Sequence, residues 1–254
     1  AEAPEADPGF DDRDWTAADR TTTVSPIKPK TLPVLYADDY GYHHGHVWYR
    51  GRFTATGEET EVRLNAITGK GGIYQVWLNG RYLGSAAGGE QKDADEPVNP
   101  DPGPGTFAVP PGLLKKGETA VLAVLVENMG HNDDWTADDV RHKQPRGLVG
   151  ATVAGDPGPI TWKIQGAART DRVRGPLNNG GLYGERTGWH LPGFPDRSWT
   201  PASPAARRVG PGVTWYRTEF RLDLPKGHDV PLTLRFGGGS GAPHRVLIYV
   251  NGWG

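Results

Sequence analysis

The chain of 254 residues contains no cysteine and a single methionine. The lack of cysteine excludes disulfide bridges and thiolate metal sites, but it does not fix the cellular compartment. No apolar run approaches the roughly 20 residues of a membrane-spanning helix, and no interior segment keeps the apolar period of an amphipathic helix. The net charge is −2 with both signs interspersed, so the basic surface typical of nucleic-acid binding is absent. We therefore expect neither a membrane nor a nucleic acid as a partner.

Glycine and proline are abundant, with 37 and 23 residues, and they predict many turns and few helices. Asn79-Gly80 predicts a type I′ hairpin turn, because both residues tolerate positive φ. Apolar or alternating segments closed by Gly, Pro or Asn predict strands at Val47–Phe53, Thr60–Ala66, Ile73–Leu78, Thr106–Val109, Thr119–Glu127, Arg146–Val153 and Ile160–Ile164. Short strands joined by such turns favour an all-β fold, a β-sandwich or jelly roll.

Three motifs occur twice in the same order. Phe10–Ala18 returns as Phe194–Ala202 with six of nine positions identical, Trp48-Tyr49-Arg50 returns as Trp215-Tyr216-Arg217, and Gln75–Gly80 returns as Leu247–Gly252. Further strands follow the Asn-Gly turn of the first copy, whereas the second copy, with predicted strands at Thr214–Asp223, Pro231–Phe236 and His244–Val250, stops after that turn.

The repeat predicts two tandem jelly-roll β-sandwiches, the second incomplete. We expect a first domain over residues 1–165, a bridge over 166–192, and the N-terminal part of a second domain over 193–254. A sandwich truncated in this way would expose unpaired strand edges and an uncovered apolar face.

Several separated motifs carry a family resemblance: Tyr36–His43, Val47–Phe53, Asn128–Asn132, Pro145–Gly147, Thr161–Gly166, Arg174–Asn178, Gly188–His190 and Asp223–Gly227. In these motifs the chain resembles the C-terminal jelly-roll region of glycoside hydrolase family 35 β-galactosidases, in the large multidomain form known from fungi and actinobacteria. The resemblance implies galactose-binding-domain-like jelly rolls in an extracellular, secreted enzyme that hydrolyses terminal β-galactosides with retention. The barrel that carries the two catalytic glutamates of that family is absent from this sequence.

The resemblance thus implies a non-catalytic accessory region that braces the absent barrel and contacts the galactoside, with the barrel and the other domains of the parent enzyme as partners. Two alternatives stay open. The chain is a free-standing pair of carbohydrate-binding modules without hydrolase activity, or it belongs to a complete enzyme whose other portion lies outside this sequence.

The acidic residues predict no catalytic pair. Retaining hydrolysis needs two carboxyl groups about 5 Å apart, one of them with a raised pKa. Glu58-Glu59, Asp133-Asp134 and Asp138-Asp139 are adjacent pairs, and adjacent residues on a strand point to opposite faces. Asp11, Asp12 and Asp14 are explained by turn chemistry, in which short carboxylates bond nearby backbone amides.

Trp135 is the best candidate for binding sugar, because it lies in a polar loop beside His131, Asn132, Asp133 and Asp134. An aromatic ring can stack on the apolar face of a pyranose while such side chains bond its hydroxyl groups. The alternative is that Trp135 anchors the loop structurally. The tryptophans within strand patterns, Trp48, Trp77, Trp162 and Trp215, are expected in the core.

No metal site and no cofactor are predicted. His44 and His46 share a face of an extended strand and His43 lies beside them, but two histidines define no closed zinc site and further ligands cannot be named. The loop from Lys92 to Gly105 offers oxygen ligands for a structural calcium ion in Asp93, Asp95, Glu96, Asn99 and Asp101. Their spacing matches no defined calcium loop, so a solvated acidic loop is favoured.

Overall fold

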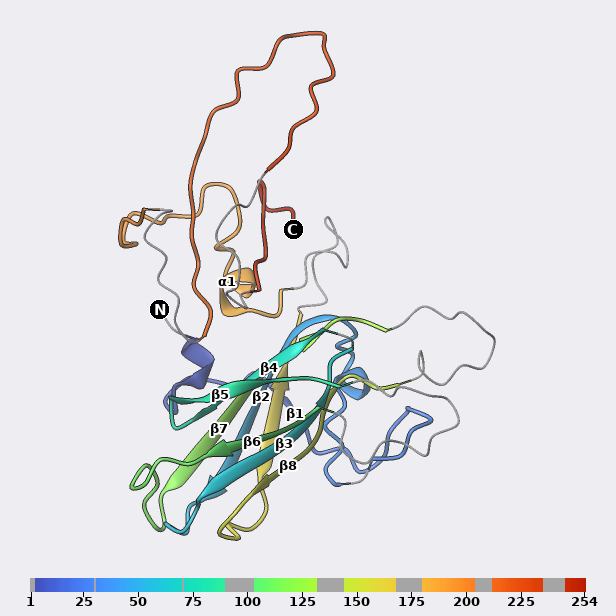
Figure 1. Cartoon of the computed structure of the whole chain (residues 1–254), viewed down its shortest axis with the longest axis vertical. Helices are drawn as coiled ribbons and strands as arrows, with labels where there is room; N and C mark the ends of the chain where they lie inside the picture. The colour runs from blue at the N-terminus through green and yellow to red at the C-terminus, as the bar shows by residue number, and fades with distance from the viewer. Residues whose placement is uncertain are drawn as a thin grey trace.

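The computed structural model describes residues 3–29, 31–69, 71–89, 103–131, 144–167, 180–203, 212–234 and 245–254. Two antiparallel sheets pack face to face (Figure 1), one of six strands in the order β1-β9-β2-β7-β4-β5 and one of three in the order β6-β3-β8. The strands are β1 (Thr16–Ala17), β2 (Gly45–Thr54), β3 (Glu61–Ile67), β4 (Ile73–Leu78), β5 (Arg81–Ala87), β6 (Pro104–Ala108), β7 (Thr119–Asn128), β8 (Gly147–Val153) and β9 (Thr161–Gln165). The predicted all-β sandwich is confirmed.

The inner core lies between the two sheets and follows the period-two alternation of the strands. Tyr49 on β2 and Leu122 on β7 point inward from the larger sheet, and Leu64 on β3 meets them from the smaller one. All three are at most 1% exposed. Trp162 on β9 also belongs to this core, as its strand pattern predicts.

A second apolar layer, the outer cluster, covers the other face of the six-stranded sheet. Trp48 on β2 and Trp77 on β4 have ring centroids 5.3 Å apart and are buried there with Leu125 of β7. The cover comes from the N-terminal segment with η1 (Pro4–Ala6) and from α1 (Tyr183–Arg186), a short helix that the sequence did not predict. Because β7 is buried on both faces, it has a continuous apolar sequence instead of an alternating one.

Asn79-Gly80 forms the predicted tight turn between β4 and β5. Both residues have positive φ, 47° and 77°, as a type I′ turn requires. Asn251-Gly252 repeats this conformation with φ of 52° and 88°, and Val250 and Trp253 form an antiparallel bridge across it. The turn chemistry of the repeated motif is therefore preserved in both copies.

The second copy forms no sandwich within the described residues. The described parts of its predicted strands, residues 214–223, 231–234 and 245–250, form no strand and pair with no neighbour there apart from the bridge at Val250, so their prediction as strands is wrong. In Figure 1 residues 212–234 run as a long excursion away from the sheets, and residues 245–254 lie near α1. The reason lies in the first copy, where β7 lies between β2 and β4 and hydrogen-bonds to both. The described residues of the second copy contain no such central strand.

The described helices are short. None of them is both long and apolar enough to cross a membrane. The 3-10 helix η2 (Ala37–Tyr40) ends at Gly41, whose φ of 81° is the left-handed conformation that glycine adopts readily. This turn brings the chain into β2 and positions His43 beside Asp38.

Candidate functional site

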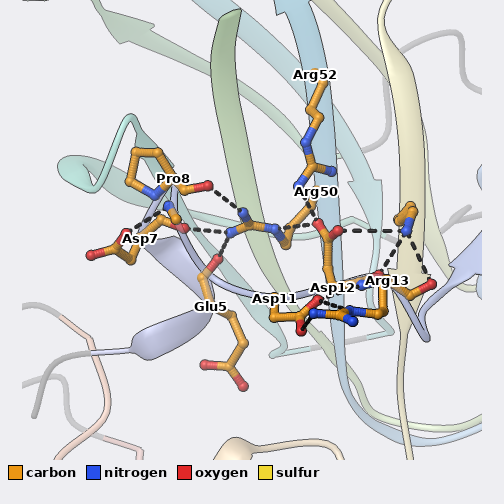
Figure 2. A network of polar contacts seen from close by, with 10 residues as sticks. Glu5, Asp7, Pro8, Asp11, Asp12, Arg13, Arg50 and Arg52 are labelled. Carbon is orange, nitrogen blue, oxygen red and sulfur yellow. Dashed lines mark hydrogen bonds and ion pairs between the residues drawn. The ribbon is translucent and has the colours of Figure 1, made fainter.

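Arg50 on β2 is the centre of a buried polar network with the N-terminal segment (Figure 2). Its side chain is fully buried, and Nε donates to Oδ2 of Asp12 at 2.7 Å. The other guanidinium nitrogens donate to the backbone carbonyls of Glu5, Asp7 (3.0 Å) and Pro8 (3.4 Å). A buried guanidinium with these partners fixes the N-terminal segment against the sheet, because an unpaired buried charge would cost several kcal/mol.

Asp12 forms ion pairs with three cationic side chains. Besides Arg50, Arg52 lies 2.7 Å from Oδ2, and Nζ of Lys163 on β9 lies 3.5 Å from Oδ1. Burial raises the pKa of Asp12, but the hydrogen bonds from Arg52 and Arg50 outweigh it and hold the pKa below its ordinary value. Asp12 is therefore an ionised structural anchor. Turn chemistry alone, the explanation expected from the sequence, accounts for Asp11, which accepts the N–H of Arg13 at 3.2 Å, but not for Asp12.

The second copy contains a smaller network of the same kind around Arg217. Nε donates to Asp196 at 3.0 Å, and Nη1 donates to the carbonyls of Trp189 and Leu191, the latter at 3.2 Å. The guanidinium lies 5.5 Å from the ring centroid of Phe194.

The two networks agree position by position. Arg50 lies 5.5 Å from the ring of Phe10, as Arg217 does from Phe194. The acceptor carbonyls in each copy lie seven and five residues before the aspartate. The repeated sequence motifs thus encode one physical unit, an arginine of the Trp-Tyr-Arg strand held by the Phe-x-Asp-x-x-Trp turn.

Buried carboxylates elsewhere are held by structural partners. Glu59 accepts the N–H of Gly57 at 2.9 Å, and Glu127 accepts the N–H of Ile73 at 3.0 Å. Burial raises the pKa of Glu5, against the influence of Arg186, whose Nη2 lies 2.8 Å away. The cavity beside Glu5 measures about 10 Å³, room for at most one water. Glu5 thus has no space for a sugar ring and cannot act as a glycosidase acid there.

Hydrogen bonds and ion pairs join the first sandwich to the later part of the chain. In the bridge, Nη2 of Arg186 lies 2.8 Å from Glu5. In the second copy, the N–H of Gly212 donates to Gln75 at 3.2 Å, and Nη2 of Arg245 lies 3.1 Å from Glu127. The second copy is therefore attached to the outer face of the first sandwich.

The histidines are arranged differently from the sequence expectation. His43, not His44 or His46, joins His131 on one oxygen of Asp38: His43 Nδ1 lies 2.9 Å and His131 Nε2 lies 2.8 Å from Oδ1. His46 Nε2 lies 3.8 Å from Oε1 of Glu127. Burial raises the pKa of Asp38, but the hydrogen bonds from His131, His43 and the N–H of Arg146 outweigh it, so the pKa lies below its ordinary value.

Of the predicted sugar-binding loop, His131 is placed by the structure, and Asn132, Asp133, Asp134 and Trp135 lie outside the described residues. His131 follows the end of β7 and contacts Asp38. The expected calcium ligands Asp93, Asp95, Glu96, Asn99 and Asp101 also lie outside the described residues.

Trp48, Trp77 and Trp162 are buried, which confirms their prediction as core residues, and Trp215 is half-buried. Trp48 and Trp77 lie in the outer cluster, so they do not form an open stacking platform. An open hollow of about 590 Å³ is lined by residues between Thr21 and Leu32, chiefly hydroxyl and proline side chains without an aromatic ring. A hollow of this kind lacks the stacking surface that usually positions a sugar.

Comparison with known proteins identifies the family to which the chain belongs. The family described as "Beta-galactosidase second all-beta domain" matches residues 10–132 and 183–254, one range in each copy of the repeat. "Beta-galactosidase A" of Aspergillus niger is 41% identical over 257 aligned positions, covering 98% of this chain and 24% of that protein. "Probable beta-galactosidase A" of Neosartorya fischeri is 39% identical over 256, with the same two coverages.

The chain therefore spans about a quarter of the length of these relatives. Among solved structures, a β-glucuronidase from glycoside hydrolase family 2 is 22% identical with a TM-score of 0.33, covering 52% of this chain and 13% of that one. A TM-score of this size is too low to establish a shared fold.

Proposed function

Because the chain belongs to the family of β-galactosidase second all-β domains, we propose that it serves as a non-catalytic accessory region of a family 35 β-galactosidase. The parent enzyme would hydrolyse terminal β-galactosides with retention. The observation that carries this proposal is the engagement of the buried carboxylates, Glu5, Asp12, Glu59 and Glu127, in ion pairs and backbone hydrogen bonds. These groups stabilise the fold and are not placed as an acid and a nucleophile.

The proposed role is to brace the catalytic barrel of the parent. The sandwich is well suited to this because its larger sheet is buried on both faces and is tied to the N-terminal segment through Arg50. A free-standing pair of carbohydrate-binding modules is the alternative. The length of the curated relatives, about four times that of this chain, favours the accessory role.

The second copy offers the surface through which this region would meet the rest of its parent. Its exposed large apolar side chains include Phe220 at 66%, Leu234 at 64% and Ile248 at 42%. Apolar side chains at this density on one segment mark an interaction surface. The first copy indicates what would cover this surface, because there β7 lies between β2 and β4. We expect a strand like β7, apolar on both faces, to lie between the segments of Trp215 and Tyr249.

The experiment is complementation. The chain, and separately the remainder of the parent, would be assayed on a chromogenic β-galactoside, alone and mixed. We expect no turnover from the chain alone, and co-elution with higher thermal stability of the remainder after mixing. Ile248→Glu should weaken co-elution, whereas Lys226→Glu, a charge change in an exposed turn, should not. Turnover by the chain alone that a single Glu or Asp substitution abolishes would refute the non-catalytic assignment.

Contact with galactoside forms a finer part of the proposal, centred on the loop from His131 to Trp135. One tryptophan platform with a few hydrogen bonds supports millimolar to micromolar affinity, roughly −4 to −8 kcal/mol. Titration with galactose and lactose would compare the wild type with Trp135→Ala and with Trp253→Ala, a control at a tryptophan that is 54% exposed. Binding that survives Trp135→Ala would remove this loop from the proposal. An extracellular location of the parent belongs to the same proposal and is tested by finding the enzyme in the culture medium.

A further inference from the structure

Asp38, His43 and His131 form a compact group, of which the proposed galactoside contact involves His131 alone. One ligand atom from each lies within 4.8 Å of the other two, namely a carboxylate oxygen and two imidazole nitrogens. Asp38 Oδ1 lies between the rings, 2.9 Å from His43 Nδ1 and 2.8 Å from His131 Nε2. Two imidazoles and one carboxylate are a frequent donor set for zinc and related ions.

A buried scaffold fixes the carboxylate of this group. The second oxygen of Asp38, Oδ2, accepts the backbone N–H of Arg146 at 2.7 Å. The guanidinium of the same residue donates to the carbonyl of Gly130 at 2.8 Å, directly before His131. Arg146 is fully buried, so it ties the carboxylate to the segment that carries one of the histidines.

The two histidine segments are also tied to each other. The side-chain amide of Asn128 donates to the carbonyl of Tyr42 at 3.1 Å and accepts the N–H of Gly130 at 2.9 Å. Tyr42 precedes His43, and Gly130 precedes His131. Hydrogen bonds that hold the backbone beside each ligand reduce the entropy lost when the ligands converge on an ion.

The side facing solvent is open. His43 is 64% exposed and His131 is 33% exposed in their side chains, whereas Asp38 is 13% exposed. Ligand atoms on a tetrahedral zinc ion with bonds of 2.0–2.1 Å lie about 3.3 Å apart. The observed separations of 2.8 and 2.9 Å therefore need to widen by about half an ångström, which rotation of two exposed rings can supply.

We propose that Asp38, His43 and His131 form a binding site for a divalent transition-metal ion of the zinc class, with the remaining coordination position open to water. On binding, each imidazole presents the lone pair of the nitrogen that now faces Asp38, and its proton moves to the other ring nitrogen. Calcium is disfavoured because it requires six to eight oxygen ligands and binds imidazole poorly.

The test uses the full chain without a histidine affinity tag, dialysed against a chelator and titrated with zinc chloride by calorimetry. We expect one zinc ion per chain. His43→Asn and His131→Asn should each weaken binding at least about tenfold, and His228→Asn, at an exposed histidine in the second copy, should leave it unchanged. Cobalt titration of the same proteins should give visible d–d absorption in the wild type that is lost in both ligand variants.

Circular dichroism of each variant separates loss of a ligand from loss of fold. His43→Asn is the decisive variant because its side chain is largely exposed and its replacement is tolerated sterically. Zinc binding that is absent in the wild type, or that is equal in wild type, His43→Asn and His131→Asn, would overturn the proposal. His131 belongs to both proposals, but zinc binding is titrated without sugar and His43→Asn lies outside the proposed sugar loop, so failure of the metal site is distinguishable from failure of the proposed function.

Discussion

Replacing Asp12 by asparagine tests whether the Arg50 network holds the first sandwich together. The substitution keeps the size of the side chain and removes its charge, so that the buried Arg50 loses its counter-ion. The repeat supplies a matched control in Asp196→Asn, because Asp196 pairs with Arg217 in the same geometry. The two aspartates differ in exposure, with side chains 6% and 43% exposed, and in that Asp12 also lies beside Arg52 and Lys163.

The expected magnitudes follow from this difference. Breaking a buried ion pair by removing one partner costs about 3–5 kcal/mol. Arg50 keeps its three backbone carbonyl partners and the amide oxygen of asparagine can still accept Nε–H, so we expect about 2–4 kcal/mol for Asp12→Asn. The exposed pair at Asp196 should contribute at most about 1 kcal/mol.

Urea unfolding at neutral pH, followed by far-ultraviolet circular dichroism, measures both values. With an m-value of about 2 kcal/mol/M, Asp12→Asn should lower the midpoint by roughly 1–2 M, and Asp196→Asn by less than about 0.5 M. Equal midpoint shifts in the two variants would refute the reasoning, since burial and the additional cations around Asp12 would then add nothing to the strength of the network.

Two further predictions concern the loss of stability at acid pH and the packing of the core. The pKa values of Asp12 and Glu127 are depressed in the folded protein. The stabilisation that these two carboxylates provide is therefore present above their unfolded-state pKa of about 4 and is lost as the pH falls through their folded-state pKa values. We expect the urea midpoint to drop between about pH 5 and pH 3. Gly51→Ala should cost about 1–3 kcal/mol, because its Cβ would meet the Trp162 ring at 2.9 Å, whereas Gly150→Ala, with its nearest contact at 3.5 Å, should be nearly neutral in thermal unfolding.

Local patterns in the sequence predicted the first sandwich well. The strand Ile73–Leu78 has the same bounds in the structure, because its alternation and the following Asn-Gly turn are both local signals. The prediction failed for the strands of the second copy, since a strand also needs hydrogen-bonding neighbours on its edges. An alternating sequence cannot show whether those neighbours are present.

The polar groups were less predictable because they come from distant parts of the chain. Asp12 meets Arg50 across 38 positions, and Asp38 meets His131 across 93. The histidine run suggested His44 with His46, whereas the fold selects His43. One sequence signal for the Arg50 network did exist: the Phe-x-Asp-x-x-Trp and Trp-Tyr-Arg motifs are repeated together, which indicates that they act on each other.

The pairing of β1 with β9 also has a consequence for the order of folding. In the described strands β1 pairs with β9 alone. The pairing of Thr16 and Ala17 therefore cannot form until Ile164 and Lys163 are in place. Lys163 also donates to the backbone carbonyl of Asp12 at 2.8 Å. During synthesis on the ribosome, the part of this sandwich that is made first would therefore be among the last of its parts to dock. Contacts of such high sequence separation slow folding, and until they form Trp48 and Trp77 lack their N-terminal cover.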